Sequence, residues 1–256
     1  MVKKGQVTIL FIVSILIIFI VAIGFFFKDQ ILDTLREEQI IGIATVPENV
    51  EPINNFISNC INIVGEEALS FVGFYGGYYD KANVDKNSRN IPYYLLNKEL
   101  KIPSKSFIQN SLNSYMNKNL KSCTEDFVDF NNSFSFTEGE VFTKTKILKS
   151  KVNFYVKYPV KLTKDDNIYQ LKFFNVDIKN NLNEIHNAIV YVLNKQKIHS
   201  DICLNCIYDI AVQNNLSVQI YNPVLGEAEY IFIDNDLRIF DDKPYKFIIA
   251  LRFKDE

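Results

Sequence analysis

Residues 151–163 read KVNFYVKYPVKLT, and apolar and polar side chains alternate along this stretch. An apolar residue at every second position is the pattern of a β-strand with one buried and one solvated face, as in antiparallel sheets. Pro159 lacks an N–H group, which predicts that it lies at a sheet edge or a bulge. The apolar positions are Val152, Phe154, Val156, Tyr158, Val160 and Leu162.

The flanking sequence predicts further antiparallel strands. The turn-forming residues KDDN (164–167) predict a hairpin, with residues 168–178 as the returning strand. Residues 140–148 predict a strand before it. Nearer the C-terminus, strands are expected at 216–222, 227–234 and 245–253.

Two segments between these strands have helical spacing of their apolar residues. They are 180–196 (NNLNEIHNAIVYVLNKQ) and 200–215 (SDICLNCIYDIAVQNN). Strands followed by helices and then strands are typical of an α+β fold. We therefore predict an α+β domain over 129–256, an antiparallel sheet with two helices.

The preceding region, 48–128, is predicted to be a helical subdomain. Residues 53–73 and 104–123 repeat apolar residues at intervals of three and four, and Ser104 is a suitable N-cap. Cys60 and Cys123 both fall on the apolar faces of these helices.

Residues 6–27 contain no charged side chain. A helix rises about 1.5 Å per residue, so this run is long enough to cross a hydrocarbon layer of about 30 Å. No small-residue cleavage site follows, which favours a retained transmembrane helix over a removed signal peptide. Lys3 and Lys4 place residues 1–5 in the cytoplasm as a short stub. Residues 28–47 are then a juxtamembrane helix and linker, and the rest lies outside the cell membrane.

The charge balance argues against a nucleic-acid partner. Residues 1–28 contain three lysines and no acid, so 25 of the 28 basic residues and all 30 acidic residues lie beyond Lys28. The expected exterior part is therefore net negative, whereas nucleic-acid binding needs a basic patch. The lipid bilayer is the partner that the sequence predicts.

The four cysteines allow three pairings. We expect Cys60 to pair with Cys123 and Cys203 with Cys206, because each pair lies within one predicted subdomain and an exterior location permits disulfides. Asn131 and Asn215 begin glycosylation sequons and are candidate glycosylation sites.

The motif CLNC (203–206) also suggests two chemical alternatives. A Cys-x-x-Cys pair at a helix start can be redox-active, but no strand leads into this motif. His186 and His199, with Cys203 and Cys206, are a candidate Cys2His2 zinc set, although an oxidising exterior would compete for the thiolates. A local disulfide is the favoured interpretation. No catalytic residue and no cofactor is predicted, and acidic pairs such as Asp165–Asp166 lie in expected turns.

The opening KKGQVTIL (3–10) resembles class III, pilin-like signals of archaeal proteins. More broadly, the chain is similar to a set of uncharacterised archaeal membrane-anchored proteins. The shared features are Lys3–Leu10, Cys60 with Gly76-Gly77-Tyr78, Pro92-Tyr93-Tyr94, Cys123 and Pro244–Arg252. This resemblance implies a location and no mechanism.

In pilins a peptidase cuts at the cytoplasmic edge of the apolar helix, which would correspond to the Gly5–Gln6 bond. Leu10 stands where pilins often have Glu, which argues against a major pilin.

These observations predict a single-pass, membrane-anchored extracytoplasmic protein with a structural or binding role. One alternative is a minor pilin or pseudopilin-like subunit, whose partners would be further copies of itself or envelope and pilus components. A second alternative is an extracytoplasmic metal-binding or redox protein.

Overall fold

The structure is a computed structural model of the chain, and it describes residues 47–199, 201–222 and 224–253. The predicted transmembrane helix, the juxtamembrane segment up to residue 46 and the Gly5–Gln6 bond lie outside the described residues. Among the residues that the structure does describe, no helix is both long and apolar enough to cross a membrane. Residues 48–256 form one compact unit.

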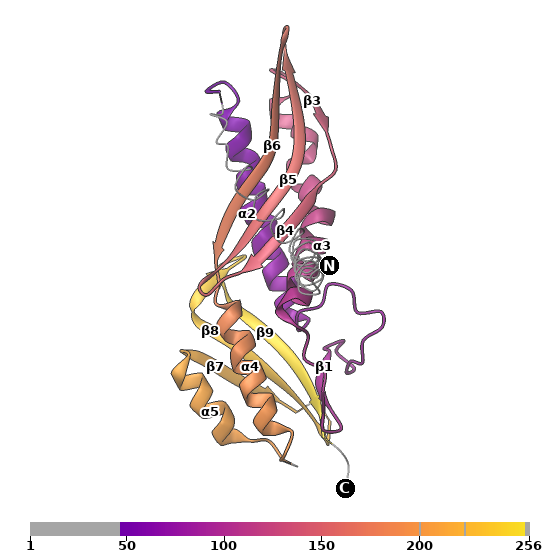
Figure 1. The fold of residues 1–256 in the computed structure, drawn as a ribbon, viewed down its shortest axis with the longest axis vertical. Coiled ribbons are helices and arrows are strands. Elements are labelled where there is room, and N and C mark those ends of the chain that lie inside the picture. The colour runs from indigo at the N-terminus through magenta and orange to yellow at the C-terminus, as the bar shows by residue number, and fades with distance from the viewer. Residues whose placement is uncertain (1–46, 200, 223, 254–256) are drawn as a thin grey trace, which may run out of the picture. The chain divides into compact units, whose positions relative to one another are not determined.

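The described part of the chain is α+β, as predicted (Figure 1). Its α-helices are α2 (Glu51–Phe74), α3 (Lys105–Thr124), α4 (Leu182–Gln196) and α5 (Leu204–Gln213), and a 3-10 helix, η1 (Glu125–Phe130), follows α3. Ser104 is the N-cap of α3, where its side chain accepts a hydrogen bond from the N–H of Phe107, as expected.

The first sheet is built around β5 (Lys151–Lys164), the alternating strand. β6 (Asn167–Lys179) pairs with one edge of β5, and β4 (Phe142–Ile147) and β3 (Ser135–Glu138) share the other edge, all antiparallel. The six alternating apolar residues of β5 are all fully buried. The register between β5 and β6 shifts between Lys157 and Val160, so Pro159 lies at a bulge, one of the two positions predicted for it.

The second sheet has the strand order β2-β1-β9-β8-β7. The C-terminal strands β7 (Leu216–Tyr221), β8 (Glu227–Ile239) and β9 (Lys243–Arg252) are antiparallel, as predicted. β1 (Tyr93–Leu96) runs parallel to β9, however, and β2 (Glu99–Leu100) pairs with β1. The prediction of one C-terminal antiparallel sheet is therefore incomplete: the described strands form two sheets, and one of these is mixed. Parallel strands such as β1 and β9 are joined by a long connection in the chain. The sequence around β1 therefore does not indicate which strand it pairs with.

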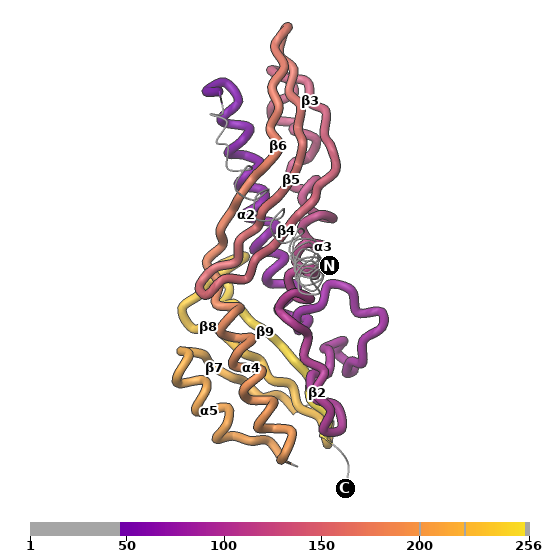
Figure 2. Tube along the Cα trace, viewed as in Figure 1, coloured from indigo at the N-terminus to yellow at the C-terminus, as the bar shows by residue number. Residues whose placement is uncertain are grey.

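Figure 2 shows α2 running alongside the first sheet and ending near the level where the two sheets meet. Near its middle, Gly65 packs against Phe154 of β5 and Ile178 of β6. Near its end, a Cβ on Gly73 would lie 2.5 Å from the backbone oxygen of Lys246 on β9, so only glycine allows this approach. α2 therefore belongs to the cores of both sheets, and α3 lies beside it.

Different elements cover the two faces of the second sheet. On one face, Gln196 at the end of α4 is hydrogen-bonded to Tyr230 of β8. On the other face, Ile248 and Ala250 of β9 pack in a cluster with Ile91 and Tyr93. The sheet is thus enclosed by α4 and by the long connection between α2 and β1.

Candidate functional site

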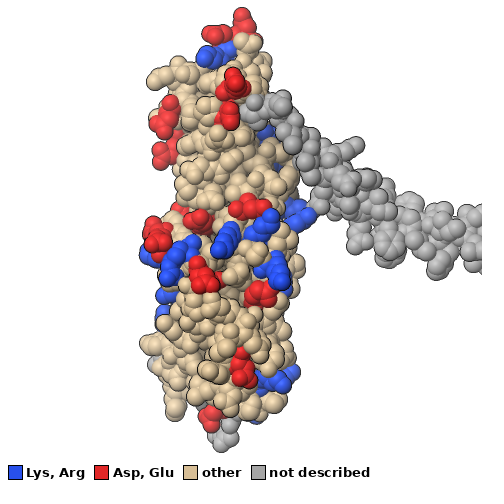
Figure 3. Space-filling view, turned by 90° about the vertical axis from the view of Figure 1, so that its left-hand side faces the viewer, with Lys and Arg blue, Asp and Glu red and all other residues tan. Residues whose placement is uncertain are grey.

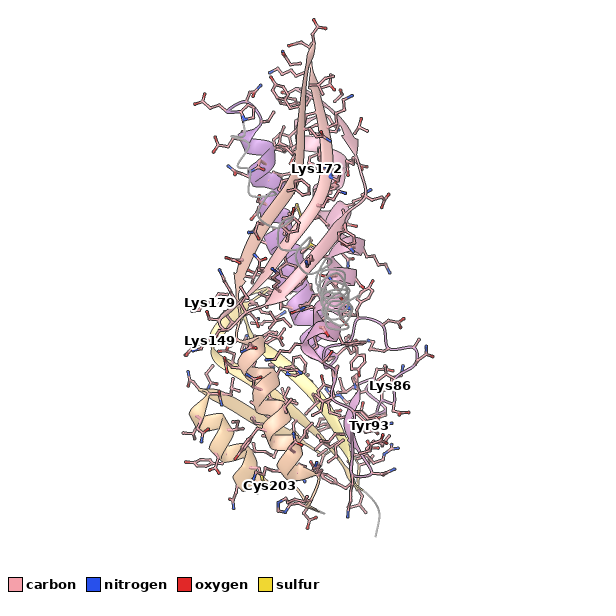
Figure 4. All side chains as sticks on the ribbon, viewed as in Figure 1. Lys86, Tyr93, Lys149, Lys172, Lys179 and Cys203 are labelled. Carbon is pink, nitrogen blue, oxygen red and sulfur yellow. A yellow bond between two sulfur atoms is a disulfide. The ribbon has the colours of Figure 1, made fainter. Side chains whose placement is uncertain are left out.

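The connection between α4 and α5 brings together three residues that could bind a metal. The ligand atoms of His199, Cys203 and Cys206 all lie within 4.8 Å of one another. Cys203 and Cys206 are joined by a disulfide with Cα atoms 5.4 Å apart, which is the pairing that the sequence predicted. Figure 4 shows Cys203 at the ends of α4 and α5.

A buried glutamine, Gln196, holds this connection in place. Its Oε1 accepts hydrogen bonds from the N–H of Cys203 and the hydroxyl of Tyr230, each at 2.8 Å, and its Nε2 donates to the carbonyl of Asp201 at 2.7 Å. Sequence reasoning missed Gln196. The available signal was its position, because it continues the apolar spacing of Val192 and Leu193 on α4, where an apolar residue is expected.

The surroundings of the cysteines determine what the site can do chemically. Cys203 is the N-cap residue of α5, so its sulfur lies at the end of the helix where unpaired N–H groups and the helix dipole stabilise a thiolate. His199 is exposed and both cysteines are half-buried, so solvent and reductants can reach the bond. Reduction would give two thiols beside an imidazole, which are three of the four ligands of a tetrahedral zinc site.

His186, the fourth residue of the predicted zinc set, is not part of this group. It lies on α4 ten residues before Gln196, which at about 1.5 Å per residue is about 15 Å along the helix. Its Nε2 donates to the backbone carbonyl of Pro103 at 2.9 Å, which requires a protonated Nε2. Burial, with a smaller contribution from the charge of Lys105, lowers the pKa of His186 below its ordinary value of 6.5. It fastens α4 to the start of α3.

The other disulfide joins Cys60 of α2 to Cys123 of α3, with Cα atoms 5.7 Å apart, again as predicted. Cys60 is only 1% exposed, and its sulfur lies in the interface between the two helices. This bond has the environment of a structural cross-link, in contrast to the accessible bond between Cys203 and Cys206.

Both glycosylation candidates lie on the surface. Asn131 follows η1 and is exposed. Asn215 is exposed and adopts a left-handed backbone with φ of 52°, and its Nδ2 donates to Asp236 at 2.5 Å. A glycan can be attached only to an exposed asparagine, and both residues meet this requirement. Glycosylation at Asn131 and Asn215 stays a prediction.

Polar contacts between distant segments fasten the α2–β1 connection and β1 to the second sheet. Glu229 is fully buried and accepts hydrogen bonds from Asn87 at 2.5 Å and Arg89 at 2.8 Å. Tyr93 donates to Glu227 at 2.6 Å, and burial, together with this bond, raises the pKa of Tyr93 to about 12. Sequence reasoning missed both networks, because the partners are more than 130 residues apart.

One side of α5 is apolar and exposed. Leu204, Tyr208 and Val212 are spaced by four residues, and each is at least 64% exposed. Figure 3 shows that charged side chains on this side of the molecule gather at the level where the two sheets meet, and that they are fewer at the level of α5.

Comparison with protein-family models, curated proteins and solved structures finds no match for this chain. The pilin-like N-terminus therefore stays a prediction from residues 3–10, and function has to be argued from the residues themselves.

Proposed function

We propose that this chain is a single-pass, membrane-anchored extracytoplasmic protein with a binding or structural role. The observation that carries the proposal is that all four cysteines, each of them in the described part of the chain, are in disulfides. Cytosolic reductants keep most thiols reduced, so paired cysteines favour an oxidising compartment. The uncharged run at residues 6–27 supplies the anchor.

The Cys60–Cys123 bond supports the exterior location most strongly. It joins two cysteines that are 63 residues apart in the chain, and it lies where the apolar faces of α2 and α3 meet. A cross-link of that length stabilises a fold by about 4 kcal/mol in the chain-entropy model. A fold that depends on this bond would be weakened in a reducing compartment.

The experiment combines intact mass with protease accessibility. Membranes are prepared with a thiol-alkylating reagent present, and we expect a mass without added alkyl groups. Protease added to intact cells should degrade residues 48–256. Alkylation of all four cysteines, or protection of this region until the cells are lysed, would overturn the proposal. The same spectrum tests the minor-pilin alternative, because a mass that begins at Gln6 would show cleavage of the Gly5–Gln6 bond.

A metal-binding or redox role is a second candidate, and the geometry of His199, Cys203 and Cys206 favours it. After treatment with a dithiol reductant, we expect the chain to take up one zinc ion. Cys203→Ser should abolish this uptake and His199→Ala should weaken it, whereas His186→Gln should leave it unchanged. Equal zinc uptake by the Cys203→Ser variant would exclude this site.

A further inference from the structure

One face of the first sheet, called the open face, is not covered by any helix in the described part of the chain. Cross-strand partners share a face, and the buried residues of β5 point toward α2 and α3, so their neighbours in sequence point outward. The outward rows across β4, β5 and β6 follow from the register. They are Phe142–Lys157–Phe173, Lys144–Tyr155–Asn175 and Lys146–Asn153–Asp177, with Lys151–Lys179 beyond them.

This open face is strongly basic. On the described strands β4, β5 and β6 it carries six lysines and one carboxylate, although the chain as a whole has a net charge of −2, and Lys157, Lys161 and Lys179 are exposed. The carboxylate, Asp177, is paired with Lys151 at 2.6 Å. The six lysines are Lys144, Lys146, Lys151, Lys157, Lys161 and Lys179. A charge of opposite sign to the whole protein, concentrated on one surface, favours an anionic partner.

The lysines form a line rather than a pocket. Lys151 and Lys161 are ten residues apart on β5, which is about 33 Å at the rise of a β-strand. Figure 4 shows Lys179 of β6 at one end of the sheet and Lys172 farther along the same strand. A small anion needs donors that converge on one point, whereas this spacing suits a polymer with repeated negative charges.

Aromatic rings and amides lie between the lysines. The rings of Tyr155 and Phe173 are stacked, with centroids 5.9 Å apart, and Phe142 is 64% exposed in the neighbouring row. Lys172 lies over the ring of Phe173 at 5.1 Å. Asn153 donates to Asn175 at 2.5 Å, so amide groups face the solvent beside the rings. Rings pack against the C–H face of a sugar, amides bond its hydroxyls, and lysines pair with its carboxylates.

We propose that the open face of the first sheet binds an acidic polysaccharide, whose carboxylates pair with the lysines and whose sugar rings stack on Tyr155 and Phe173. The choice of a cell-surface glycan over other polyanions rests on the proposed extracytoplasmic location. The charge and the ring geometry do not depend on that location.

The test measures binding of the detergent-solubilised full chain to polygalacturonate, with neutral dextran as the comparison. A triple variant, Lys157→Gln/Lys161→Gln/Lys179→Gln, removes three charges from the open face. The matched control, Lys118→Gln/Lys195→Gln/Lys197→Gln, removes three exposed charges elsewhere. We expect affinity to fall as salt rises, at least a tenfold loss for the open-face triple, and less than a threefold loss for the control.

A further variant tests the stacking. Phe173→Ala should weaken polygalacturonate binding severalfold at every salt concentration, because it removes a ring and no charge. Tyr155, the other ring of the stacked pair, is unchanged in this variant.

The proposal is overturned if the chain does not bind polygalacturonate, or if both triples lose the same affinity, which would mean that only net charge matters. Tighter binding of poly(dT) than of polygalacturonate would assign the face to single-stranded nucleic acid. Vesicle binding tests a lipid partner. If the open-face triple no longer prefers phosphatidylglycerol to phosphatidylcholine vesicles, and its polygalacturonate binding is unchanged, the open face is assigned to a lipid surface. Protease protection in cells would overturn the exterior location without affecting these binding results, so the two failures are distinguishable.

Discussion

The carboxylate of Glu229 on β8 is fully buried, and its Oε2 lies 2.8 Å from Nη1 of Arg89, which is 140 residues earlier in the chain. Arg89 itself is partly exposed, so the guanidinium closes the site from the solvent side. This contact holds the connection between α2 and β1 against the second sheet.

Arg89→Met is expected to lower the free energy of unfolding by about 1–3 kcal/mol, because it removes a charged partner of a buried carboxylate. Glu229→Gln in the same background should recover part of the loss, since a neutral amide needs no counter-charge. Urea unfolding of the two variants and their combination measures this coupling. Strictly additive effects would show that the two residues do not interact energetically.

The two disulfides should contribute unequally to stability. Cys60–Cys123 closes a loop of 63 residues and Cys203–Cys206 one of 3, so the chain-entropy model gives about 4 and about 2 kcal/mol respectively. Thermal unfolding of Cys60→Ala/Cys123→Ala and of Cys203→Ala/Cys206→Ala checks this order. The reverse order would mean that strain or residual structure in the unfolded chain dominates.

Gln196→Leu should both destabilise the protein and speed the reduction of the Cys203–Cys206 bond. It leaves the buried hydroxyl of Tyr230 without its partner and frees the N–H of Cys203, which we expect to cost about 2 kcal/mol. Reduction by a dithiol, followed by alkylation and peptide mass, should show faster opening of Cys203–Cys206 with Cys60–Cys123 unchanged. Gln196→Glu keeps an acceptor for Cys203 and Tyr230 and loses the donor to Asp201, so its Cys203–Cys206 bond should open more slowly than in Gln196→Leu. An unchanged rate of reduction in Gln196→Leu would mean that Gln196 does not restrain the connection.

His186 should make the fold less stable in acid. Its pKa is lowered in the folded state, chiefly by burial, so the unfolded chain binds a proton at a higher pH than the folded chain. The stabilisation is thus complete above the ordinary pKa of 6.5 and declines as pH falls below it. Urea midpoints between pH 7.5 and 5 should fall more steeply for the wild type than for His186→Gln. Parallel curves would contradict this assignment.

The sequence was most informative where one face of an element is buried and the other solvated. The alternation along β5 predicted its buried face residue by residue, and the spacing on α2 and α3 predicted that Cys60 and Cys123 face each other. The parallel pairing of β1 with β9 was not predictable, because a fully buried segment such as Tyr93–Leu95 has no periodicity that identifies its neighbour.

The candidate site was predictable in composition and only partly in geometry. The spacing of CLNC indicated a local disulfide, and His199 was named from its nearness in sequence. His186 was a candidate for the same set, but it is not part of the group that His199, Cys203 and Cys206 form, because its distance along α4 depends on where that helix ends. Gln196 and Glu229 act through partners that come together only in three dimensions, so no local motif marks them.

The position of α2 has a mechanical consequence. The chain enters the described fold at Val50 and continues directly into α2, which packs on the first sheet at Gly65 and on the second at Gly73. A pulling force applied to the chain before Val50 therefore acts along the axis of α2. It loads the contacts of α2 with both sheets in shear. The Cys60–Cys123 bond lies on α2 between Val50 and both of these glycine contacts, so it passes part of the load to α3.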